Sequence, residues 1–139
     1  MSTSIEGKIV DGLITQFGTV TLPSGCGVDY PNMTFTPDST HPYVRLVVAK
    51  NQPVSGRLSG GHEPIRMGIL LATVCWPIGQ GIGAASDLAN SIRNAFAFGT
   101  KWTYSGIEFR IVDEPMVQGD IVSGAYDEIP VVIPWRVYP

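Results

Sequence analysis

One stretch of the chain, residues 65–76, constrains the fold more than any other because it is apolar almost without interruption. The longest apolar run, Gly68 to Pro77, is about half as long as a membrane-spanning helix, and a stretch of this length suits a strand. Alternate residues of a strand point to opposite faces of the sheet. The two faces would carry Ile65, Met67, Ile69, Leu71 and Cys75 on one side, and Leu70, Ala72, Val74 and Trp76 on the other. A strand that is apolar on both faces is typical of a sheet that is covered on both faces.

Two segments carry apolar residues at helical spacing and would supply one of these covers. The spacing predicts a helix over 4–17, preceded by a sequence that resembles a capping box, with Thr3 as the cap and Glu6 reaching back. A second helix is predicted over 83–98, closed by Gly99. A neighbouring subunit is a candidate for the second cover.

Further strands are predicted at 43–50, in a hairpin around Ser105-Gly106, and at 125–138. Proline has no backbone donor, so Pro130 and Pro134 would place the last strand at an edge or turn it out of the sheet. Residues 51–64 and 113–123 are predicted to be loops. The order favours one α+β domain over residues 1–139, with a mostly antiparallel β-sheet and two helices packed on one face.

The composition indicates a protein that works in contact with other proteins. Only 15% of the residues are charged, against about 25% in ordinary soluble domains. The net charge of −3 disfavours nucleic acid as a partner, since binding to its backbone needs clustered Lys and Arg. No membrane span is expected. Two cysteines, Cys26 and Cys75, indicate neither a disulfide framework nor a zinc cluster.

A glycine-rich turn at residues 79–84 satisfies the pattern G-x-G-x-x-A, which in dinucleotide-binding folds lets a pyrophosphate approach a helix. A small-ligand or nucleotide-binding module that uses the Gly79–Ala84 turn is therefore one alternative function. The context argues against it, because the turn lies past mid-chain and leads into a hairpin, without the acidic residue expected about 20 residues later. The simpler interpretation is a tight connection between a strand and a helix.

Catalytic and metal-binding patterns are weak. His41 and His62 lie in predicted loops and have no ligand spacing with each other or with the cysteines. No serine lies in a G-x-S-x-G turn. We therefore expect a protein that is not an enzyme and uses no cofactor.

Charge is distributed unevenly along the chain. Basic residues dominate between 45 and 66, namely Arg45, Lys50, Arg57 and Arg66, while acidic residues dominate between 108 and 128, including Asp113, Glu114 and Asp120. These residues could be solvated loops. Alternatively, a basic loop of one copy meets an acidic loop of another, in a head-to-tail contact that can close into a ring. In that case, reversing the charges of Arg57 and Arg66 weakens self-association.

Several short segments in order resemble one known family. They are Tyr30-Pro31-Asn32, Phe35-Thr36-Pro37, Pro42-Tyr43-Val44-Arg45, the turn at 79–85 with Leu88-Ala89 and Ile92, and Val131–Arg136. Their order and spacing resemble small tail-terminator proteins of long-tailed bacteriophages over about residues 1–137.

The resemblance implies a structural virion protein without an active site, assembled in the host cytoplasm. It implies a six-membered ring of identical subunits on the head-proximal end of the tail tube, which ends tube polymerisation and offers a surface to the head. Tail-tube and head–tail connector proteins would be its partners, through loops 51–64 and 113–123. A head–tail connector or head-completion ring subunit is the alternative within virion proteins.

Overall fold

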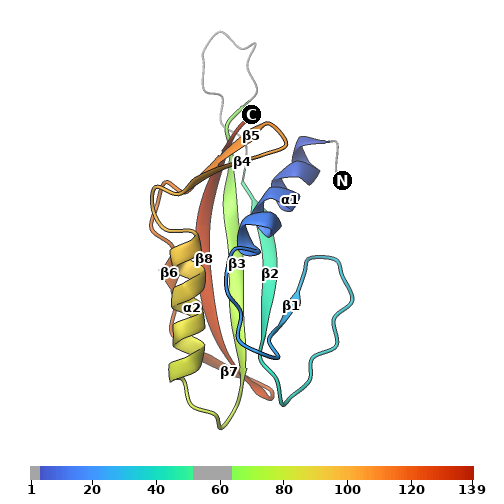
Figure 1. The fold of residues 1–139 in the computed structure, drawn as a ribbon, viewed down its shortest axis with the longest axis vertical. Helices are drawn as coiled ribbons and strands as arrows, with labels where there is room; N and C mark the ends of the chain where they lie inside the picture. The colour runs from blue at the N-terminus through green and yellow to red at the C-terminus, as the bar shows by residue number, and fades with distance from the viewer. Residues whose placement is uncertain (1–3, 52–63) are drawn as a thin grey trace.

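Two long strands form the frame of the molecule. The computed structural model describes residues 4–51 and 64–139. Within them, β3 (Arg66–Pro77) and β8 (Tyr126–Tyr138) pair antiparallel from Arg66 opposite Val137 to Pro77 opposite Tyr126. Both strands run along the longest dimension of the molecule (Figure 1). The strand predicted at 65–76 is confirmed to within one residue at each end.

Shorter strands extend this pair on both sides. On the β3 side, β2 (Tyr43–Lys50) pairs antiparallel with β3, and β1 (Gly27–Asp29) pairs parallel with β2. On the β8 side, β5 (Ile107–Arg110) pairs with β8, and β4 (Lys101–Tyr104) forms a hairpin with β5. The sheet order is β1-β2-β3-β8-β5-β4. The expected mostly antiparallel sheet is therefore confirmed.

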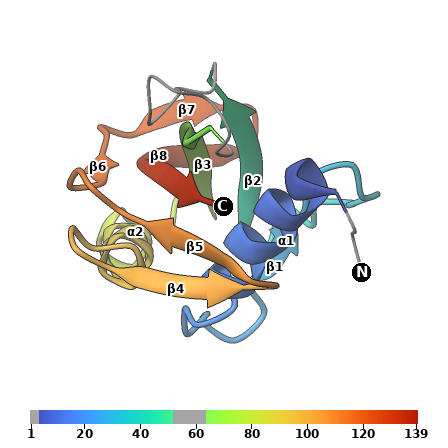
Figure 2. The same cartoon turned by 90° about the horizontal axis from the view of Figure 1, so that it is seen from above.

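Two helices cover one face of this sheet, which confirms the α+β class. They are α1 (Ile5–Phe17) and α2 (Gly83–Ala95), and Figure 2 shows both on the same side of β3 and β8. The core between helices and sheet is a continuous apolar cluster that includes Ile9, Leu13, Leu88, Ile92, Leu70, Ala72, Val74, Val131, Ile133 and Trp135. The apolar stripes of the helices and one face of each long strand meet here, as their periodicities predict.

A glycine inside α1 has a packing role. A Cβ atom at Gly12 would lie 2.3 Å from Cζ of Phe109, so only glycine lets this ring rest against the helix. The indole Nε1 of Trp102 donates to the Gly12 carbonyl at 3.2 Å, and its ring stacks on Phe109. This contact ties the β4–β5 hairpin to α1, and it compensates for the low helix propensity of glycine.

The start of α1 differs from the sequence prediction. The capping residue is Ser4, whose Oγ accepts a hydrogen bond from the Gly7 amide at 3.2 Å; Thr3 lies outside the described residues. The Glu6 carboxylate does not reach back to the cap, because it binds Lys50 and Arg66 instead. Two cationic partners outcompete one backbone amide for this carboxylate.

The prediction that β8 lies at an edge or leaves the sheet is wrong. Its second edge is paired in succession with β7 (Ile121–Ser123), β6 (Met116–Val117) and β5. Pro130 lies between the residues that pair with β7 and β6, and Pro134 lies between those that pair with β6 and β5. The Pro130 carbonyl accepts a hydrogen bond from the Gln118 amide at 2.9 Å. Because the nitrogen and carbonyl of one strand residue face the same neighbour, the Pro130 nitrogen also points to the edge of β8 where β7, β6 and β5 pair. The N–H groups that Pro130 and Pro134 lack therefore fall in the gaps between β7, β6 and β5, where no ladder bond is lost.

Two predicted boundaries also change. The predicted loop 113–123 contains the short strands β6 and β7, and the second helix ends at Ala95 rather than near residue 98. Most of the predicted loop 51–64, including Arg57 and His62, lies outside the described residues.

Candidate assembly surfaces

The sheet face opposite the helices is only partly covered by the chain itself. At one end of this face, Phe35 packs on a small buried cluster of Tyr43, Cys75 and Tyr126. Beyond that cluster, apolar side chains are open to solvent. Val47 is 45% exposed, Ile69 36% and Met116 58%. In the sequence, β3 is apolar on both faces, and in the structure its helix side is buried while part of its other side has no cover within the described chain.

The register shows that these side chains form one surface. Val47, Leu71, Val132 and Met116 lie opposite one another across β2, β3, β8 and β6, and the next row along the strands is Ala49, Ile69 and Pro134. Residues opposite each other in a ladder share a face of the sheet. We call these seven residues the open face. A pocket of about 270 Å³ at its end is lined in part by Ile69, Pro134, Arg136 and Asp113.

The charged residues singled out from the sequence are distributed around the molecule. Arg45 lies at the border of the open face and pairs with Glu128 at 3.1 Å. Lys50 pairs with Glu6 of α1 at 2.7 Å, and Arg66 also contacts the Glu6 carboxylate. The hydrogen bond from Lys50 is the main cause that lowers the pKa of Glu6. These three basic side chains therefore each have an acidic partner within the same chain.

The acidic residues lie in two places. Asp113 lines the pocket at the open face, and the Glu114 carboxylate accepts a hydrogen bond from the Phe98 amide at 3.3 Å. Asp120 lies at the other end of the molecule, beside Asp127. The structure thus does not bring Asp113, Glu114 and Asp120 together into one acidic patch.

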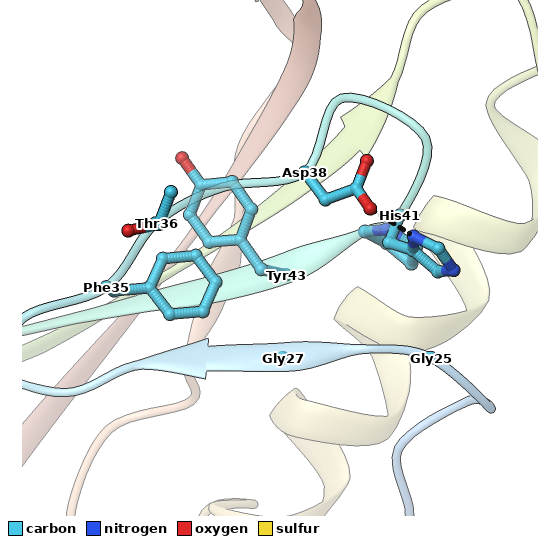
Figure 3. A pocket seen from close by; sticks show the side chains of 8 residues that line it. Gly25, Gly27, Phe35, Thr36, Asp38, His41 and Tyr43 are labelled. Atoms are coloured by element: carbon cyan, nitrogen blue, oxygen red, sulfur yellow. Dashed lines mark hydrogen bonds and ion pairs between the residues drawn. The ribbon is translucent and has the colours of Figure 1, made fainter.

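A second hollow lies between β1 and the start of β2. Figure 3 shows Phe35 and Tyr43 side by side in this pocket of about 330 Å³, and their ring centroids are 4.9 Å apart. Burial is the main cause that raises the pKa of Tyr43 to about 12. The Asp38 carboxylate and the Thr40 hydroxyl both lie 3.0 Å from Nδ1 of His41 at the rim.

This His41 arrangement locks a turn and does not form a catalytic triad. In a triad the acid and the nucleophile bind opposite ring nitrogens of the histidine, whereas here both partners share Nδ1. Hydrogen bonds from the backbone and side chain of Thr40, followed by the one from His41, lower the pKa of Asp38 to about 2. The group is therefore an exposed turn, in which the Asp38 carboxylate contacts the Thr40 amide, the Thr40 hydroxyl and the His41 ring.

The glycine-rich turn does not form a dinucleotide-binding unit. β3 precedes the turn, and both of its neighbours run antiparallel to it. After α2 the chain enters the β4–β5 hairpin instead of a parallel strand. The βαβ unit that presents a pyrophosphate to a helix N-terminus is therefore not formed around residues 79–84.

Residues 4–51 and 64–139 contain neither a metal-binding cluster nor a membrane-spanning helix. Nowhere in these ranges do three His, Cys, Asp or Glu side chains gather in a group suited to a metal ion. None of the helices in the same ranges has the length and apolar character to cross a membrane.

The described residues form an α+β fold with an apolar sheet face that the same residues leave partly uncovered. The family model for phage tail terminator protein matches residues 8–135. The chain therefore belongs to the phage tail terminator family, a structural family of the bacteriophage virion, which confirms the resemblance found in the sequence.

Two solved structures share this fold. One solved chain has a TM-score of 0.65 and 23% identity, and the alignment covers 96% of this chain and 92% of that chain. The other is part of the virion of a native gene transfer agent particle, with a TM-score of 0.64, 15% identity and coverage of 99% and 100%. No curated protein matches the chain at a significant level.

The open face contains the residues that sequence reasoning missed. The contact residues predicted from the sequence are charged and do not include Val47, Met116 or Val132, and Ile69 enters the prediction only as part of an apolar face that a neighbouring subunit could cover. The signal was present, because the strand at 43–50 carries valine on both of its faces, as the strand at 65–76 carries apolar residues. Apolar side chains on the solvent side of an antiparallel sheet are themselves a sign of a partner.

Proposed function

We propose that the chain forms a closed ring of identical subunits that caps the head-proximal end of the phage tail tube. The ring ends tube polymerisation and offers its other side to the head–tail connector. Membership of the tail terminator family supports this role in the tail. The observation within the molecule that carries the self-assembly part is the open face, because an apolar surface across four strands needs a protein cover.

The contact between copies is centred on the open face. Its middle rows are apolar, with Val47, Ile69 and Met116 as its most exposed members. Charged groups border it, with Arg45 and Glu128 at one end and Arg136 and Asp113 at the other. An apolar centre with a polar rim is the usual anatomy of a stable protein interface.

We propose the other charged residues as secondary contacts of the ring or the tube. Lys50 and Arg66 lie beside Glu6, so a second copy has to share or replace this partner. Asp113 is exposed. Such rim charges set the rate and specificity of association more than its strength.

A tube-length assay tests the capping role. Tail-tube protein of the phage that encodes this chain is polymerised with increasing amounts of the purified chain, and tube lengths are measured by electron microscopy. We expect shorter tubes at higher ratios, with the chain at one end only. Unchanged lengths, combined with copurification of the chain with portal or adaptor protein, would instead establish the connector role.

A further inference from the structure

One end of the molecule concentrates negative charge. It is the end where β3 finishes, β8 begins and α2 starts, at the bottom of Figure 1. Half of the twelve acidic residues of the chain lie here, namely Asp29, Asp38, Asp87, Asp120, Asp127 and Glu128. Among the described residues of these elements, the basic side chain at the same end is Arg45, which pairs with Glu128. We call this region the acidic end.

The acidic end also exposes apolar side chains. Ile121 and Val122 of β7 are 59% and 66% exposed, and Ile78 and Ile82 of the glycine-rich turn are 52% and 41% exposed. The Ile78 amide donates to the Ala125 carbonyl at 3.1 Å, so the turn lies against the β7–β8 hairpin. Single exposed aliphatic residues are common on protein surfaces, whereas exposed aliphatic residues on two neighbouring connections indicate an interaction site.

A groove begins beside these residues. It has a volume of about 440 Å³ and runs between α2 and residues 21–23, with Trp76 and Leu88 among its apolar lining residues. Asp87 and Ser91 of α2 form a polar border. The glycine-rich turn, which forms no nucleotide site, thus joins a groove to an exposed hairpin.

Two carboxylates at this end are held in a costly arrangement. Oδ1 of Asp127 is buried and has no hydrogen-bond partner in the structure. Burial and the neighbouring Asp120 carboxyl raise the pKa of Asp127. Like charges at close range disfavour ionisation of the pair. The repulsion between the two carboxylates does not stabilise the folded monomer. A cationic group of a partner would relieve it.

We propose that the acidic end docks on the tail-tube protein, through a contact face that carries Lys or Arg around apolar side chains. The proposal rests on the proposed capping function for the identity of the partner. Nucleic acid and anionic lipid are poor occupants because this end would repel their phosphates. In the proposed ring the contact between copies is centred on the open face, so the acidic end is left for a different partner.

A binding experiment with isosteric variants tests the contact. Purified tail tubes of the phage that encodes this chain are sedimented with wild-type protein and with Asp120→Asn/Asp127→Asn, at low and at moderate salt. The double variant removes charge and keeps side-chain shape. We expect it to bind at least about tenfold more weakly than wild type and with a weaker salt dependence, while its unfolding temperature stays equal or rises. Asp11→Asn/Glu108→Gln, which changes two acids of α1 and β5 outside the acidic end, is the matched control and should bind as wild type does.

A second variant tests the apolar part without touching charge. Ile121→Ser/Val122→Ser should also lose tube binding, because both side chains are exposed in the free subunit and should be covered in the complex. Sedimentation velocity without tubes measures ring formation separately. Intact rings with unchanged tube binding by both variants would overturn the docking proposal and leave the ring standing. The same holds if wild-type rings bind the connector protein and not the tube. A wild-type chain that stays monomeric would contradict the proposed function itself.

Discussion

Replacing the exposed apolar residues of the open face should separate self-association from folding. The variant Val47→Thr/Ile69→Thr/Met116→Gln keeps strand-compatible side chains and removes most of the apolar surface that awaits a cover. Full burial of such a side chain contributes about 1.5–3 kcal/mol. The exposed fractions of 45%, 36% and 58% therefore leave roughly 1 kcal/mol at each position, about 3 kcal/mol together.

This free energy sets the size of the expected effect. Since about 1.4 kcal/mol corresponds to a tenfold change in an equilibrium constant, the association constant of each contact should fall by about a hundredfold. Sedimentation velocity over a concentration series measures the shift from ring to monomer. Folding should change little, so the far-ultraviolet circular dichroism spectrum should match that of wild type.

A matched control and a refuting result make this prediction sharp. Ile78 and Ile82 are exposed to 52% and 41% and belong to the glycine-rich turn at the acidic end, so Ile78→Thr/Ile82→Thr should associate as wild type does. If the triple variant folds and associates as strongly as wild type, the open face is not the contact between copies. If the control variant dissociates instead, the contact lies elsewhere on the surface.

Three further predictions concern stability. Gly68→Ala should destabilise the fold by about 3 kcal/mol or more, measured by thermal unfolding, because the new Cβ would lie 2.1 Å from the Ala49 carbonyl oxygen and 2.7 Å from Trp135; a loss under about 1 kcal/mol would show that the sheet yields easily here. Ser4→Ala should cost about 1 kcal/mol through loss of the α1 cap, and Ser4→Asp should restore it. Asp127→Asn should raise the unfolding temperature at neutral pH. The pKa of Asp127 is raised in the folded state, so its ionisation costs stability as the pH rises through the folded pKa, and this gain should vanish in acid. An equal gain at all pH values would contradict the last explanation.

The sequence predicted the parts of the fold that depend on local periodicity. The strand at 43–50 has the bounds of β2, and the helix at 4–17 differs from α1 by one residue. The prolines of β8 led to a wrong prediction, because a missing donor excludes a ladder bond only at its own position, and the partners β7, β6 and β5 leave gaps at Pro130 and Pro134. β6 and β7 were missed because two or three residues show no period, and pairing with β8 defines them.

The surfaces were less predictable than the fold because they depend on contacts between distant residues. The partners of Arg45 and Lys50 lie 83 and 44 positions away, so sequence proximity could not show that these charges are paired within one chain. The sequence did indicate an uncovered apolar face, because β3 is apolar on both sides and the two helices cover one of them. Which residues of the neighbouring strands complete that face follows from the register alone.

Electron microscopy of the purified chain, alone and mixed with tail tubes, tests the central claim most directly. The account predicts closed rings with a single subunit number, and one ring at one end of each tube. In the reconstructed ring, the open face of every subunit should be covered by its neighbour. Monomers at high protein concentration, or rings that leave Val47, Ile69 and Met116 exposed to solvent, would contradict it.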